Sequence, residues 1–141
     1  MRNGFTLPEL LSVIAIAGVL LSIVIPPLGR LLDQAAVHES VDRFAALHAT
    51  TRQLAISRNA LARLELDSSR HRATLSVRRT ATAWDTVGSY VLGSAVFSCS
   101  NPTLVFGPLG LGYGTSNARV IFTRGAAADT VTTSRTGRLR R

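Results

Sequence analysis

The sequence predicts an α+β fold in which one long N-terminal helix packs on a small antiparallel β-sheet domain. Three observations lead to this prediction: an uncharged apolar run near the N-terminus, an apolar stripe at helical spacing directly after it, and short segments of alternating polarity over the rest of the chain. At 141 residues the chain has room for one folded domain.

The first observation is the run of twenty residues from Leu10 to Gly29, which contains no charge. A helix of this length rises about 30 Å, which matches the hydrocarbon core of a bilayer. An ordinary secretory signal is disfavoured, because its cleavage-like sequence Ala15-Ile16-Ala17 comes too early in an apolar run that continues well beyond it. A simple membrane anchor with Arg2 on the cytoplasmic side fits the length but leaves Glu9, at the entrance of the run, unexplained.

The second observation is an amphipathic pattern from Leu28 to about Arg58. We expect residues 30–59 to continue the helix, with its apolar stripe on the folded domain. The stripe consists of Leu28, Leu31, Leu32, Ala35, Val41, Phe44, Ala45, Leu47, Leu54 and Ala55.

The third observation is a change to period two after Asn59, which predicts a β-rich domain over residues 60–141. Turn-forming residues separate seven candidate strands, at residues 61–66, 73–79, 87–92, 95–97, 103–106, 119–123 and 130–133. The glycine-rich stretch Gly107–Gly114 is not a G-x-G-x-x-G sequence and lacks the lysine of a P-loop, so we interpret it as a turn between strands.

The segment Gly4-Phe5-Thr6-Leu7-Pro8-Glu9-Leu10-Leu11 resembles the type IV prepilin cleavage motif. The resemblance implies that a prepilin peptidase removes residues 1–4 by cutting between Gly4 and Phe5 and then methylates Phe5. Pro8 departs from the commoner aliphatic residue, but proline is tolerated in the first turn of a helix, where its missing N–H has no partner to lose. Residues 5–29 would then be the transmembrane helix that becomes the filament core.

Glu9 and the proline pair are the chemically notable residues of this helix. A carboxylate in an apolar zone costs on the order of 3 kcal/mol without a partner, so intramembrane acids are usually functional. The resemblance implies that Glu9 pairs with the amino group of Phe5 on a neighbouring subunit and sets the filament register. The alternative is an acid that is stabilised by the helix N-terminus and reaches the interface. Pro26 and Pro27 predict a kink or break in the helix.

Over nearly its whole length the chain resembles the GspH/FimT family of minor pilins and pseudopilins. The resemblance rests on the helix-then-sheet order and on Ala55-Ile56-Ser57-Arg58-Asn59, Trp84, Phe106-Gly107-Pro108 with Gly110, and Gly137-Arg138. It implies a structural subunit, at or near the tip of a type IV pilus or a type II secretion pseudopilus, whose partners are other pilin subunits and the prepilin peptidase. The subunit would start in the bacterial inner membrane, with a cytoplasmic N-terminus and a periplasmic domain. A plain single-pass protein whose exterior domain binds a partner is the competing class.

The C-terminus is strongly basic. The chain has a net charge of +8, all sixteen basic residues are Arg, and four of them, Arg135, Arg138, Arg140 and Arg141, lie in the last seven residues with no acid. One interpretation is a solvated, frayed terminus. The other is phosphate contact, because clustered Arg residues release counterions from a nucleic-acid backbone. Gly137-Arg138-Leu139-Arg140 also resembles the G-R-x-R motif of FimT-type minor pilins, which implies DNA binding for uptake in natural transformation as the alternative function.

The residues that would support catalysis do not form a recognisable pattern. His38, His48 and His71 lack metal-ligand spacing, and we interpret them as surface or interface residues. The single Cys99 excludes an internal disulfide, and the eight acids are scattered. We therefore expect no enzyme activity, no cofactor and no metal site.

Overall fold

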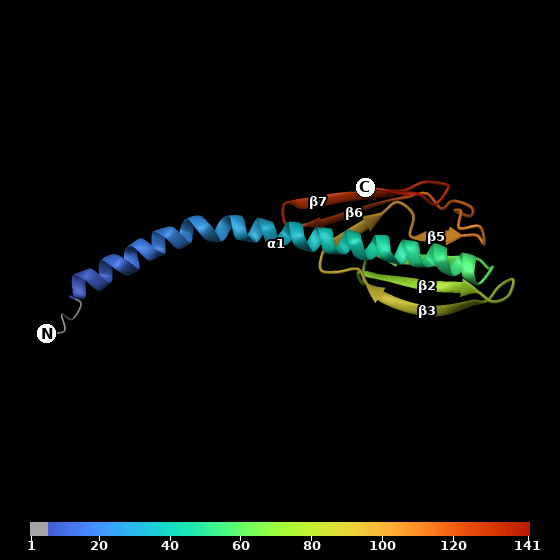
Figure 1. Cartoon of the computed structure of the whole chain (residues 1–141), viewed down its shortest axis with the longest axis horizontal. Helices are drawn as coiled ribbons and strands as arrows, with labels where there is room; N and C mark the ends of the chain where they lie inside the picture. The colour runs from blue at the N-terminus through green and yellow to red at the C-terminus, as the bar shows by residue number, and fades with distance from the viewer. Residues whose placement is uncertain (1–5) are drawn as a thin grey trace. The chain divides into compact units, whose positions relative to one another are not determined.

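The computed structural model describes residues 6–141, with the side chains of residues 23–27 excepted. One long helix, α1 (Leu7–Ser57), precedes all the strands (Figure 1). The strands are β1 (Ala62–Asp67), β2 (Arg72–Arg78), β3 (Trp84–Val91), β4 (Val96–Cys99), β5 (Thr103–Phe106), β6 (Ala118–Arg124), β7 (Ala127–Thr133) and β8 (Leu139–Arg140). The chain divides into two compact units, Met1–Leu32 and Asp33–Arg141.

The strands form two antiparallel sheets of four, in the orders β3-β2-β1-β5 and β4-β6-β7-β8. Figure 1 shows β2 and β3 along one side of α1 and β6 and β7 along the other. The chain changes sheet between β3 and β4, returns to the first sheet at β5, and changes again before β6. The sequence predicts a single sheet, and the structure has two. The alternation of polar and apolar residues could not distinguish these cases, because it is the same in one sheet as in two sheets that share a core.

The core of the second unit lies where α1 meets both sheets. Phe44 of α1 packs against Phe122 of β6, with ring centroids 6.0 Å apart, and the ring of His48 meets Phe106 of β5. The face of α1 that the domain buries consists of Ala36, Val37, Ser40, Val41, Phe44, His48, Thr51 and Ala55. Val41, Phe44 and Ala55 of the predicted stripe are buried as expected, Ala45, Leu47 and Leu54 are partly buried, and Ala35 is exposed.

The first unit is different, because its described apolar side chains are exposed. Leu28, Leu31 and Leu32, which the periodicity placed on the buried stripe, are exposed like the described residues of α1 before them. The prediction was wrong for these residues because the β-domain packs against α1 only from about Asp33 onward. Within the described residues, no helical segment is both long and apolar enough to qualify as a membrane span.

The ends of α1 and of the strands follow local chemistry. The helix ends before Asn59, which has a left-handed φ of 46°, and the Ala60 N–H donates back to the Ala55 carbonyl at 3.1 Å. Strand β5 matches its predicted bounds, whereas β3 begins three residues earlier than predicted, at Trp84, and β8 was not predicted.

Candidate functional site

The described part of the N-terminal motif begins at Thr6, so Gly4 and Phe5 lie outside it. The Glu9 carboxylate accepts hydrogen bonds from the Thr6 N–H and Thr6 Oγ1, each at 3.4 Å. The Thr6 carbonyl in turn accepts from the N–H groups of Glu9 and Leu10, at 3.1 and 3.2 Å. A Thr followed three residues later by a Glu is the capping-box pattern, in which the acid satisfies a free N–H at the helix start. The T-x-x-E spacing could have revealed this local role of Glu9 from sequence.

The residues around Glu9 form a regular helix start. Leu7 is the first helical residue and Pro8 lies in the first turn, where the sequence analysis expected a proline to be harmless. The Glu9 side chain is exposed. Its long bonds to Thr6 leave the carboxylate accessible to other donors.

The proline pair does not interrupt α1, which runs without a gap from Leu7 to Ser57. The expected break at Pro26 and Pro27 is therefore not found. Proline has a φ close to the helical value and removes one donor, so the helix can pass through it with fewer hydrogen bonds. A kink at this point stays a prediction.

The C-terminal residues form a β-hairpin and are not frayed. Strand β8 pairs with β7 in the register Thr132↔Arg140 and Thr133↔Leu139. The turn before it is closed by the Ser134 N–H, which donates to the Arg138 carbonyl at 2.8 Å. The segment is therefore solvated, as that interpretation expects, but it is not frayed.

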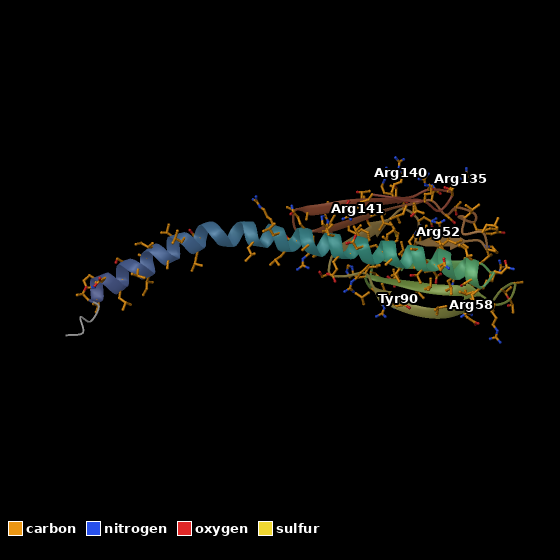
Figure 2. All side chains as sticks on the ribbon, in the orientation of Figure 1. Arg52, Arg58, Tyr90, Arg135, Arg140 and Arg141 are labelled. Atoms are coloured by element: carbon orange, nitrogen blue, oxygen red, sulfur yellow. The ribbon has the colours of Figure 1, made fainter. Side chains whose placement is uncertain are left out.

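The hairpin separates the tail arginines, because successive strand residues point to opposite faces. Arg141 contacts α1 and β7: its Nε lies 2.9 Å from Asp129 Oδ2, its Nη1 lies 3.3 Å from Asp42 Oδ1, and its Nη2 lies 3.1 Å from His38 Nδ1. Arg140 points the other way and is exposed (Figure 2). Arg141 is thus a bridge within the domain, which argues against its predicted role as a free phosphate contact.

A basic pocket lies on the outward side of this hairpin. It has a volume of about 440 Å³ and is lined by Ser134, Thr136, Arg138 and Arg140. Arg138, Arg140 and the exposed Arg135 have no ion pair within the described residues. Guanidinium groups beside hydroxyls are suited to the oxygens of a phosphate.

Sequence reasoning missed one arginine of this surface. Arg119 of β6 pairs with Thr132, which in turn pairs with Arg140, so the three side chains share one face of the sheet. Arg119 is exposed and lies outside the terminal cluster in sequence. Only the strand register places it on the same face as Arg140, two strands away, and no pattern in the sequence predicts that register.

The histidines differ from the expectation at one position. His48 is only 3% exposed, its Nε2 has no hydrogen-bond partner in the described part of the chain, and its ring meets the Phe106 ring edge-on at 4.9 Å. Burial, helped by the nearby positive charge of Arg52, lowers the pKa of His48 from 6.5 to about 4. His48 is therefore a neutral core residue and not a surface histidine, because its helical position faces both sheets.

The remaining candidate groups are the metal-ligand residue types and Cys99. In the stretch from residue 6 onward, no three side chains of the His, Cys, Asp and Glu types come together to hold a metal. Burial raises the pKa of the half-buried Cys99 thiol, which disfavours the reactive thiolate.

The structure is thus a long N-terminal helix whose C-terminal half packs on two antiparallel sheets. The family profile described as the prokaryotic N-terminal methylation motif matches residues 1–25. No curated protein matches the sequence.

Two solved structures have a similar fold. The minor pseudopilin EpsH from the type 2 secretion system of Vibrio cholerae aligns with a TM-score of 0.62 and 15% identity, over 74% of this chain and 94% of EpsH. The type IV minor pilin FimU of Pseudomonas aeruginosa aligns with a TM-score of 0.58 and 14% identity, over 82% of this chain and 91% of FimU. The methylation motif agrees with the prepilin resemblance found in the sequence, and the two likenesses show that the chain has the pilin fold that the resemblance predicted.

Proposed function

We propose that the chain is a minor pilin or pseudopilin, a structural subunit at or near the tip of a type IV pilus or a type II secretion pseudopilus. The observation that carries this proposal is the methylation motif over residues 1–25 on a chain with the fold of a minor pseudopilin and a minor pilin. The protein acts by assembling with other pilin subunits. The related solved structures are named as pilins or pseudopilins and not as enzymes, which supports a non-catalytic role.

Processing and anchoring come before assembly in this proposal. The prepilin peptidase cuts between Gly4 and Phe5 and methylates Phe5. Until assembly, residues 5–29 span the inner membrane, with a cytoplasmic N-terminus and a periplasmic domain. The uncharged run from Leu10 to Gly29 and the exposed apolar side chains early in α1 support this placement.

Registration in the filament depends on Glu9. Its exposed carboxylate would accept a hydrogen bond from the amino group of Phe5 in the neighbouring subunit. A charge-assisted bond of this kind is stronger than the long bonds to Thr6, so the capping contacts do not prevent the pairing. Thr6 would hold the carboxylate near the helix start until the neighbour arrives.

The test is the mass of the mature chain after co-expression with a prepilin peptidase. We expect a chain that starts at methylated Phe5, and a Gly4→Leu variant that keeps Met1. Glu9→Gln should be cut normally but enter filaments less, whereas Glu39→Gln, on the exposed part of α1 in the second unit, should assemble normally. A wild-type chain that still begins at Met1, or that is cut after Ala17, contradicts the proposal.

DNA binding for uptake is the second candidate function. The specific observation in its favour is the pocket in which Arg138 and Arg140 lie beside hydroxyl groups. Arg135, which has no ion pair among the described residues, lies in the adjoining turn. Phosphate contacts of this type give affinity that falls steeply with salt.

The second test compares salt-dependent DNA binding of the detergent-solubilised full chain with that of an Arg138→Ala/Arg140→Ala variant. The matched control is Arg70→Ala/Arg79→Ala, which removes the same charge from exposed positions elsewhere. The proposal is supported if DNA affinity, and the steepness with which it falls as salt rises, decrease in Arg138→Ala/Arg140→Ala but not in the control. Equal, weak binding by all three proteins excludes the hairpin surface as a DNA site.

A further inference from the structure

The loop Gly107–Gly114, between β5 and β6, presents apolar side chains to solvent. The Gly107 N–H donates to the Leu111 carbonyl at 2.8 Å, and the Gly110 N–H donates back to the Gly107 carbonyl at 2.8 Å, so the intervening residues form a tight turn. Leu109 lies in this turn and is 84% exposed. Leu111 and Tyr113 are also exposed, so three large apolar side chains of one loop face solvent, and grouped exposure of this kind is typical of an interaction site.

The turn is held firmly against the rest of the domain. Arg52 of α1 donates from Nε to the Gly110 carbonyl at 2.8 Å. Gly110 has a φ of 70°, and a Cβ at this position would lie 2.8 Å from Ile56 Cδ1, so glycine allows the turn to sit directly on the end of α1. On its other side, Gly112 packs against the Arg135 carbonyl of the β7–β8 turn. The exposure of Leu109 is therefore a property of an anchored turn.

The segments that contact this loop are basic and contain no acid. Residues 52–58, 103–119 and 133–141 have no Asp or Glu between them. We call Arg52, Arg58 and Arg135 the arginine collar, and Figure 2 places all three toward the end of the domain at which α1 finishes. Arg58 and Arg135 are exposed, and no collar residue has an ion pair among the described residues.

We infer that the loop Gly107–Gly114 and the arginine collar bind the surface of an anionic lipid membrane. Protruding apolar side chains insert at the boundary between headgroups and acyl chains, and the surrounding guanidinium groups contact the phosphates. A leucine that projects from a convex turn needs no shaped pocket in its partner, which favours a fluid lipid surface over an acidic protein. The inference goes beyond the proposed function, and its test uses the apolar helix as an anchor.

The experiment is a tethering assay with the full chain. The protein is reconstituted through α1 into phosphatidylcholine vesicles, and anchoring is checked by flotation after alkaline washing. These vesicles are then mixed with a second population, with or without phosphatidylglycerol, and tethering is followed by energy transfer between lipid dyes. We expect tethering only to the anionic population, and weaker tethering at high salt.

Two variants separate the apolar and the basic contributions. Leu109→Ser/Leu111→Ser should weaken tethering at least about tenfold, because each buried leucine contributes on that scale. Arg58→Gln/Arg135→Gln should weaken it by roughly fivefold for each arginine. Val87→Ser/Val96→Ser and Arg70→Gln/Arg79→Gln are the matched controls, at exposed positions on other elements, and should tether like the wild type.

The outcomes distinguish the inference from the proposed function. Protein that does not float with the first vesicles contradicts the membrane anchor of the proposed function. Anchored protein that tethers no second vesicle, or that tethers neutral and anionic vesicles equally, overturns the inference. The same holds if the loop variant tethers as well as its control while its thermal unfolding is unchanged.

Discussion

The two halves of α1 share one secondary structure but have opposite surroundings. Before Asp33, apolar residues occupy every face of the helix, and those described are exposed. After Asp33, the buried residues recur every three or four positions and pack against both sheets. A helix with one apolar stripe can bury that stripe against its own domain. A helix that is apolar on every face must be buried by other molecules, such as lipids or neighbouring subunits. The pattern of apolar residues, more than their number, thus tells which half the domain stabilises.

The largest expected effect is on the free energy of unfolding, when one large apolar side chain in each half of α1 is replaced by alanine. Phe44 is fully buried against Phe122, so Phe44→Ala should lower the free energy of unfolding by about 3–5 kcal/mol. Leu20 is 59% exposed, so Leu20→Ala should change it by less than about 0.5 kcal/mol. Urea unfolding of the full chain in detergent, followed through the fluorescence of Trp84, measures both. Similar losses in the two variants would contradict the division of α1.

A smaller effect concerns the pH dependence of the buried half. The pKa of His48 is about 4 in the folded chain and 6.5 in the unfolded chain, so the unfolded state takes up a proton first as the pH falls. Stability is therefore complete above about pH 6.5, declines between pH 6.5 and 4, and has lost roughly 3 kcal/mol below that window. Urea unfolding at a series of pH values should show this decline in the wild type and a much smaller one in His48→Leu. Equal declines would contradict the assignment to His48.

The smallest effect concerns the contact between the C-terminal hairpin and α1. The ion pairs of Arg141 with Asp42 and Asp129 are partly exposed, so Arg141→Gln should cost less than about 1 kcal/mol of global stability. Hydrogen exchange at Leu139 and its neighbours should nevertheless quicken, because β8 is only two residues long and loses its tie to the helix. Arg138→Gln, on the outward side, is the control and should leave exchange unchanged. The assignment of Arg141 as a bridge is wrong if both variants exchange alike.

Most of the fold could be predicted from the sequence because periodicity reports burial. The change from helical to period-two spacing after Asn59 located the end of α1 within two residues, and β5 matched its predicted bounds. The division into two sheets could not be predicted, since it depends on where the chain crosses between β3 and β4. Ser40 and His48 were also missed, because small and polar residues on a buried helical face do not stand out as apolar ones do.

The N-terminal motif could be predicted from the sequence better than the C-terminal surface, because the motif is local whereas the surface depends on strand register. The cleavage motif and Glu9 are local in sequence, so the resemblance could identify them, although their roles stay predictions. The sequence predicts phosphate contact for all four tail arginines and places Arg138 and Arg140 in the G-R-x-R motif. The pairing of β8 with β7 turns Arg141 toward Asp42 and places Arg140 on the same face as Arg119, two strands away, and this register is set by tertiary contacts that no short motif encodes.

The capping contacts between Thr6 and Glu9 have a consequence for maturation. Both residues lie on the C-terminal side of the proposed cut between Gly4 and Phe5, so the signal that starts α1 is kept when the leader is removed. The precursor and the mature chain would begin their helices at the same residue. Cleavage would then free the amino group of Phe5 close to a helix start that already exists. No further folding step would be needed, and the subunit would be ready to assemble as soon as it is cut.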